Sequence, residues 1–99
     1  MDTLKSALIG QKVVVRTFSA GVHIGELTAK AGKEVALKDA HRLWYWNGAF
    51  TLNQVAAEGV KVGSKVGMAV PTIELTEAIE VIPITDEAFA TLGQFVERR

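Results

Sequence analysis

The sequence predicts a small α+β domain in which a mainly antiparallel sheet carries a short helix after the third strand and an amphipathic helix at the C-terminus. β-branched and alternating apolar residues recur in short runs that glycine-containing turns separate. Two later segments begin instead with helix-capping residues and continue with apolar residues at three- and four-residue steps. A chain of 99 residues has enough apolar surface for one core. We therefore expect a single domain over residues 1–99.

The N-terminal part is predicted to form three strands. Val13, Val14 and Val15 favour a strand over residues 12–18, which Ser-Ala-Gly ends. A second strand follows over 22–30, and Ala-Gly-Lys makes a tight turn before a third that begins at Glu34.

Alternation along this third strand predicts which side chains share a face, provided that no bulge intervenes. One face would hold Val35, Leu37, Asp39, His41, Leu43 and Tyr45. The other would hold Ala36, Lys38, Ala40, Arg42, Trp44 and Trp46.

The remaining elements are predicted from local signals. Thr51 followed by Gln54 forms a capping box, and Gly59 is a suitable C-terminal residue, so a helix is expected over 52–58. Strands are expected over 65–70, with Pro71 ending the first, and over 77–84.

The last helix is predicted from Thr85, which is placed as its N-cap. Asp86 and Glu87 suit the positive end of its dipole, and Arg98 and Arg99 would lie at its C-terminal end. The expected order of elements is therefore β-β-β-α-β-β-α.

Composition narrows the possible functions. The absence of cysteine excludes disulfides, thiolate metal sites and cysteine nucleophiles, and 11 basic residues balance 11 acidic ones. With no long apolar run and no signal peptide at the start, a cytoplasmic protein without a membrane span is expected.

The charges are nevertheless unevenly distributed along the chain. Residues 1–68 carry +4 and residues 69–99 carry −4. An anionic ligand would therefore be sought in the first two-thirds, although opposite charges could also simply attract within the chain or an oligomer.

Catalysis is not expected. His23 and His41 are isolated from metal-binding spacings, and no nucleophile elbow, dinucleotide fingerprint or P-loop is present. Glu74, Glu77 and Glu80 are more typical of solvated positions than of an acid/base pair. We predict a protein that is not an enzyme, with no catalytic residues, no metal and no cofactor.

The segment RLWYWNGAF, residues 42–50, contains both tryptophans and the single tyrosine. Alternation directs Trp44 and Trp46 to one face and Tyr45 to the other, so a large aromatic surface points away from the core. Aromatic rings beside Arg42 and Lys38 suit a nucleobase and its phosphate. The alternative is that the tryptophans cover a second core face or a subunit interface.

A second candidate group lies around the first hairpin. Arg16, Thr17, Ser19 and His23 bring a guanidinium, two hydroxyls and an imidazole close to glycine-containing backbone. Together they could hold a phosphodiester through several hydrogen bonds. Alternatively, Ser-Ala-Gly is an ordinary turn and His23 an ordinary strand residue.

At these two stretches, VVVRTFSAGVHIGEL and RLWYWNGAFTLNQVAAEGV, the chain resembles a family of small phage-encoded proteins, over about residues 12–84. That family is similar to the phage sponge proteins that defeat the CBASS defence, which as tetramers bind cyclic dinucleotides such as 3′3′-cGAMP without cleaving them. The resemblance implies an immune-evasion protein of the bacterial host cytoplasm. It also implies a homo-oligomer, expected as a tetramer, with a cyclic dinucleotide as ligand and no long nucleic acid.

Our physical argument assigns roles to the candidate residues. Trp44 or Trp46 would stack on a base, or Tyr45 if the strand faces the other way, while Arg16 and Arg42 would meet phosphates. Hydrogen bonds to phosphate, ribose or base edges would come from Thr17, Ser19, His23, Asn47 and Thr51.

Three other functions are compatible with the same residues. A phage structural or accessory protein would use the tryptophans for subunit contacts. A single-strand nucleic-acid-binding module would use the same aromatic and basic surface, and a nucleotide hydrolase would alter its ligand.

Overall fold

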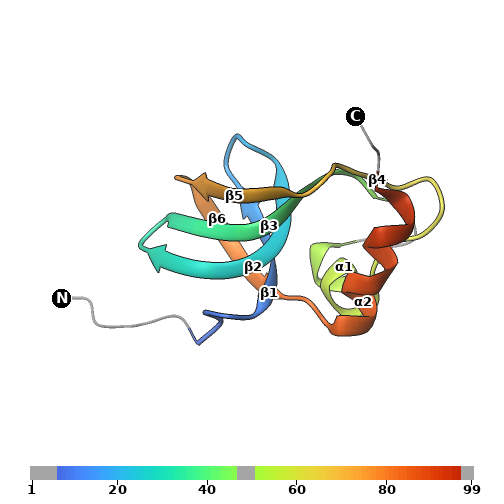
Figure 1. Ribbon diagram of the computed structural model, residues 1–99, viewed down its shortest axis with the longest axis horizontal. Coiled ribbons are helices and arrows are strands. Elements are labelled where there is room, and N and C mark those ends of the chain that lie inside the picture. The colour runs from blue at the N-terminus through green and yellow to red at the C-terminus, as the bar shows by residue number, and fades with distance from the viewer. Residues whose placement is uncertain (1–6, 47–50, 97–99) are drawn as a thin grey trace.

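A six-stranded sheet and two short helices make up the protein, whose computed structural model describes residues 7–46 and 51–96 (Figure 1). The elements are β1 (Lys12–Thr17), β2 (Val22–Ala31), β3 (Glu34–Tyr45), α1 (Leu52–Glu58), β4 (Lys65–Val66), β5 (Val70–Leu75), β6 (Ala78–Pro83), α2 (Asp86–Leu92) and the 3₁₀ turn η1 (Gly93–Phe95). All strand pairs in the sheet are antiparallel. The expected α+β class with a small, mainly antiparallel sheet is confirmed. Asn47, Arg98 and Arg99 lie outside the described residues.

The sheet curls until its two edges approach each other. The order is β4-β3-β2-β1-β6, with β5 also beside β3, so β5 and β6 belong to opposite edges. Only Thr76 and Glu77 connect them, and two residues cannot span a flat sheet of this width. The N–H of Ala78 also donates to the Lys33 carbonyl across 3.0 Å, which ties β6 to the β2–β3 turn. A partly closed barrel results.

A bulge in β3 provides the bend that this curl needs. Asp39 adopts φ 52°, and the pairing between β2 and β3 shifts between Ile24 and Glu26. Gly25 faces this point, where a β-carbon would lie only 2.9 Å from the Lys38 carbonyl oxygen. Strand β3 can therefore fold closely over β2 only because residue 25 has no side chain.

The bulge changes the faces that simple alternation predicts for β3. Val35 and Leu37 are buried as expected, but Asp39 and Tyr45 are exposed and Ala40 is buried. The prediction of a single parity through this strand is wrong because the extra residue at the bulge reverses the alternation beyond it.

Two apolar clusters lie on the two sides of the sheet. Val13 and Val15 contribute to an inner cluster within the curl, together with residues such as Leu37. Val14, between them, contributes to an outer cluster with helical residues such as Leu92. Strand β1 is therefore buried on both faces, and Figure 1 shows the two helices gathered at one end of the sheet.

The C-terminal part differs from the expected element bounds. In place of one strand over 65–70 there are the two-residue β4 and the additional strand β5, which contains Pro71. Proline is tolerated there because β5 is an edge strand, whose open side needs no N–H donor. The final helix ends at Leu92, well before its expected end, because Gly93 is a poor helix former and starts a 3₁₀ turn.

None of the helices within residues 7–46 and 51–96 has the length and apolar character needed to cross a membrane.

Candidate functional site

The two stretches that the sequence singles out meet at one surface hollow, which we call the Trp44 hollow. It has a volume of about 450 Å³ and is lined by Ser19, Ala20, Gly21, Val22, Arg42, Leu43, Trp44 and Trp46. The pairing of Val22 with Leu43 brings the β1–β2 turn beside the end of β3. Four of the expected site residues therefore line a common surface: Ser19, Arg42, Trp44 and Trp46.

The three consecutive aromatic residues have different environments. Trp44 is 60% exposed, whereas Trp46 is half-buried and packs against the outer cluster. Tyr45 is 55% exposed, but it pairs with Lys65 of β4 and does not line the hollow. Trp44 is thus the ring that can stack on a ligand, and Trp46 forms a wall.

The segment that follows β4 lies beside the Trp44 indole. The N–H of Gly67 donates to the Arg42 carbonyl across 2.8 Å, and a β-carbon at residue 67 would lie 3.7 Å from Nε1 of Trp44. His41 Nδ1 donates to the Gly67 carbonyl across 2.7 Å, so this ring carries its proton on Nδ1. The indole therefore lies close to backbone that two hydrogen bonds hold in place.

The two candidate arginines lie on opposite faces of the sheet. Arg16 pairs with Val22, and Val22 pairs with Leu43, whereas Arg42 pairs with His23 in the adjacent row. Directly paired residues of antiparallel strands project from the same face, and adjacent rows project from opposite faces. Within one chain the two guanidinium groups therefore project in opposite directions, and the expectation that both meet phosphates stays a prediction.

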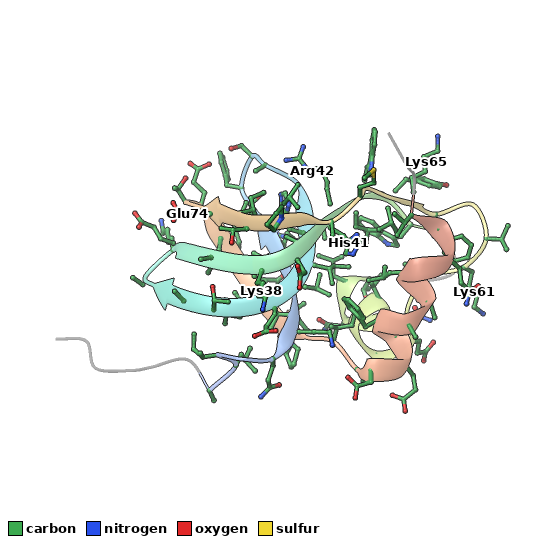
Figure 2. The ribbon with its side chains drawn as sticks, in the orientation of Figure 1. Lys38, His41, Arg42, Lys61, Lys65 and Glu74 are labelled. Atoms are coloured by element: carbon green, nitrogen blue, oxygen red, sulfur yellow. The ribbon has the colours of Figure 1, made fainter. Side chains whose placement is uncertain are left out.

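The environments of these two arginines also differ. Arg16 Nε lies 3.7 Å from Oε1 of Glu80, and both side chains are about half exposed. Arg42 is exposed and forms no salt bridge within the described parts of the chain. Figure 2 shows Arg42 and its neighbour His41 leaving β3 in different directions, with His41 toward the helices, where it meets Phe89 edge-on. Arg42 is accordingly the cation that the hollow offers to an anion.

The two hydroxyls of the β1–β2 turn are occupied within the fold. Thr17 is buried, and its Oγ1 donates to the Gly21 carbonyl while accepting the Ala20 N–H, each across 2.8 Å. Ser19 Oγ donates to Oε1 of Glu77 across 2.7 Å. Thr17 thus closes the turn and does not reach the hollow, whereas Ser19 lines it and brings a carboxylate to its edge.

His23 is also directed inward. It is 1% exposed, and its Nε2 lies 2.9 Å from the Ala20 carbonyl oxygen. A carbonyl only accepts, so Nε2 carries the proton. Burial lowers the pKa of His23 from its usual 6.5, the hydrogen bond to Ala20 raises it, and the charge of Arg42 lowers it further. The imidazole is therefore held neutral behind the turn, where it cannot contact a ligand directly.

Thr51 is the remaining expected contact among the described residues. Its side chain accepts the Gln54 N–H across 3.1 Å as the N-cap of α1, and it does not line the hollow. Ala20, Gly21, Val22 and Leu43 also line the hollow, although none of them was predicted as a contact and none carries a polar or aromatic side chain. The strand register places them there. Knowing the length of the turn between residues 17 and 22 would have fixed the pairing of β1 with β2, and with it the position of this turn.

Metal binding has no candidate group among residues 7–46 and 51–96, since nowhere there do three or more His, Asp or Glu side chains gather. Charge-assisted binding of an organic anion at Arg42, with stacking on Trp44, is the chemistry that the arrangement offers.

Comparison with known proteins gives a family and little more. No curated protein matches the chain. A chain from a structure described as the crystal structure of the NatC complex bound to CoA aligns with a TM-score of 0.46 and 17% identity, covering 93% of this chain and 99% of that chain. Residues 10–92 match the family described as a domain of unknown function, DUF6948, and the chain belongs to that family.

Proposed function

We propose that this protein binds a cyclic oligonucleotide second messenger, such as 3′3′-cGAMP, at the Trp44 hollow and sequesters it without cleaving it. As a phage protein in the host cytoplasm, it would in this way keep the CBASS effector inactive. The observation that carries the proposal is the position of Trp44, exposed beside the exposed Arg42 on the wall of one hollow.

The chemistry of the hollow suits a nucleotide. A base stacked on an exposed indole gains about 1–3 kcal/mol. A phosphodiester can accept hydrogen bonds from the guanidinium of Arg42, and such charge-assisted bonds are about twice as strong as neutral ones. Sequestration requires tight binding, and nanomolar affinity corresponds to about −12 kcal/mol.

Two copies of the chain supply what a cyclic dinucleotide needs. One Trp44 hollow offers one exposed indole and one exposed arginine, whereas the ligand has two bases and two phosphates. A two-fold axis between subunits presents each residue twice and matches the pseudo-symmetry of the ligand. We therefore propose a homo-oligomer, built as a tetramer, with its sites between subunits.

Binding without cleavage is supported by the hydrogen bonds near the hollow. His23 directs its N–H to a backbone carbonyl and not to the hydroxyl of Ser19. Ser19 in turn donates to Glu77 and has no imidazole beside it to remove its proton. These bonds stabilise the turn and do not form an activated nucleophile.

Titration calorimetry with 3′3′-cGAMP and other cyclic di- and trinucleotides tests the proposal, followed by heat release of the ligand and its chromatography. We expect tight binding, one ligand per two chains and recovery of intact ligand. An altered ligand would indicate a hydrolase instead.

The same experiment includes oligothymidine as a comparison ligand. Affinity that rises with oligonucleotide length and falls steeply with salt would favour a single-strand nucleic-acid-binding module. An oligomer that binds none of these ligands would contradict the proposal and favour a structural or accessory protein.

A further inference from the structure

His23 lies directly behind the wall of the Trp44 hollow. It is paired with Val15 on β1 and with Arg42 on β3, so the imidazole and the guanidinium project from the same face of the sheet. Its Nε2–H donates to the carbonyl of Ala20, which itself lines the hollow. One buried side chain therefore contacts the turn on one side of the hollow and neighbours the arginine on the other.

We propose that His23 is a positioning residue that holds the β1–β2 turn in its binding conformation, and that ligand binding at Arg42 is coupled to proton uptake by His23. This inference rests on the proposed function and adds to it a sensitivity to pH.

The positioning role follows from the hydrogen bond and the burial. The turn is short, and the Ala20 N–H already donates to Thr17, so the bond from His23 fixes the opposite side of the same residue. Ala20 is exposed, so a carbonyl that loses this donor bonds to water and no longer ties the turn to β2. Without this donor the turn would move, and with it the wall that faces Trp44.

The coupling follows from the charges around the ring. Val15 on β1 and Ala20 in the turn are uncharged, Arg42 on β3 is cationic, and Glu77 contacts the far side of the turn through Ser19. Arg42 and burial both lower the pKa of His23. A phosphodiester bound to Arg42 offsets its charge, so the pKa of His23 rises and the imidazole takes up a proton while Nε2 keeps its bond.

Calorimetry of the full chain with 3′3′-cGAMP in two buffers of different ionisation enthalpy measures this proton directly. Phosphodiesters do not titrate near neutral pH, so any uptake belongs to the protein. For the wild-type chain we expect uptake of a fraction of a proton at about pH 6 and none at about pH 8, with tighter binding at the lower pH.

Two variants separate the roles of His23. His23→Gln keeps an N–H donor and cannot titrate, so it should bind within about twofold of wild type at pH 8 and take up no proton at pH 6. His23→Leu removes the donor, so binding should be about tenfold weaker at both pH values. Undiminished affinity in His23→Leu overturns the positioning role, and unchanged uptake in His23→Gln overturns the coupling.

A measurement on the wild-type chain covers the case in which His23→Leu does not fold. NMR titration of the His23 ring should give a higher pKa with saturating ligand than without it, and an unchanged pKa contradicts the coupling. If the wild-type chain binds no cyclic nucleotide, the proposed function fails and this inference fails with it. If it binds without any of these effects, only the inference fails.

Discussion

The two arginines of the candidate site, on neighbouring rows of the same sheet, have opposite roles in the structure. Arg16 projects from the face that holds the outer cluster and ends beside Glu80, whereas Arg42 projects from the other face and forms no salt bridge with any described residue at the Trp44 hollow. In an antiparallel sheet, side chains one residue apart along a strand project from opposite faces. The strand register therefore separates two arginines that residue type alone does not distinguish.

The largest expected effect is the difference between the two arginines in ligand binding. Arg42→Ala should weaken binding of 3′3′-cGAMP about tenfold to a hundredfold, because hydrogen bonds to charged groups contribute about 1.5–3 kcal/mol. Arg16→Ala is the matched control and should change the dissociation constant less than about twofold. Calorimetry compares the two, and equal losses would show that both faces take part, as they could across a subunit interface.

A second comparison concerns the neighbouring aromatic residues. Trp44→Ala should weaken binding by about 1–3 kcal/mol, because it removes the indole on which a base would stack. Tyr45→Ala removes a ring of similar exposure that does not line the hollow, and should leave affinity nearly unchanged. Quenching of tryptophan fluorescence by the ligand provides a separate readout. Trp46 also lines the hollow, so some quenching should remain in Trp44→Ala, and quenching as strong as in the wild-type chain would contradict stacking on Trp44.

The buried His23 should make the unfolding free energy depend on pH. Its folded-state pKa lies below 6.5, so between the two values the unfolded chain binds more protons. The contribution of His23 to the unfolding free energy is fully present above pH 6.5 and is lost as the pH falls through the folded-state pKa. Urea unfolding between about pH 5 and pH 8 should therefore show a smaller loss of stability in His23→Gln than in wild type, and equal slopes would rule out this contribution.

The smallest expected effect is on the other face. The Arg16–Glu80 pair is half exposed on both sides, and such pairs contribute about 0–1 kcal/mol. Glu80→Gln should therefore lower the unfolding free energy by no more than about 0.5 kcal/mol in urea unfolding, and less at high salt. A larger loss would mean that Arg16 has a structural role beyond this contact.

Local chemistry could be predicted from the sequence. Thr51 and Thr85 accept the N–H groups three residues later, so each cap depends only on residues within the same short segment. The α+β class follows from such signals together with the short apolar runs. The choice of Trp44 and Arg42 as site residues rests instead on the aromatic residues beside a basic one in the sequence, and it stays a prediction.

Long-range geometry could not be predicted in the same way. The bulge at Asp39 depends on Gly25 in another strand, and β5 exists because β3 offers it an edge. The separation of Arg16 from Arg42 follows from the register of three strands. Each of these features depends on contacts between residues that lie far apart in the sequence.

The burial of β1 on both faces has a consequence for synthesis of the chain. Its partners on one side include residues of β5, and on the other side residues of α2, and both elements leave the ribosome after β3. The pairing of β1 with β2 and of β2 with β3 can therefore form while Val13, Val14 and Val15 still lack much of their cover and β1 still lacks its other partner strand, β6. A nascent chain released before Leu92 would present an apolar strand to its neighbours, so a truncated product is expected to aggregate and not to fold into a smaller domain.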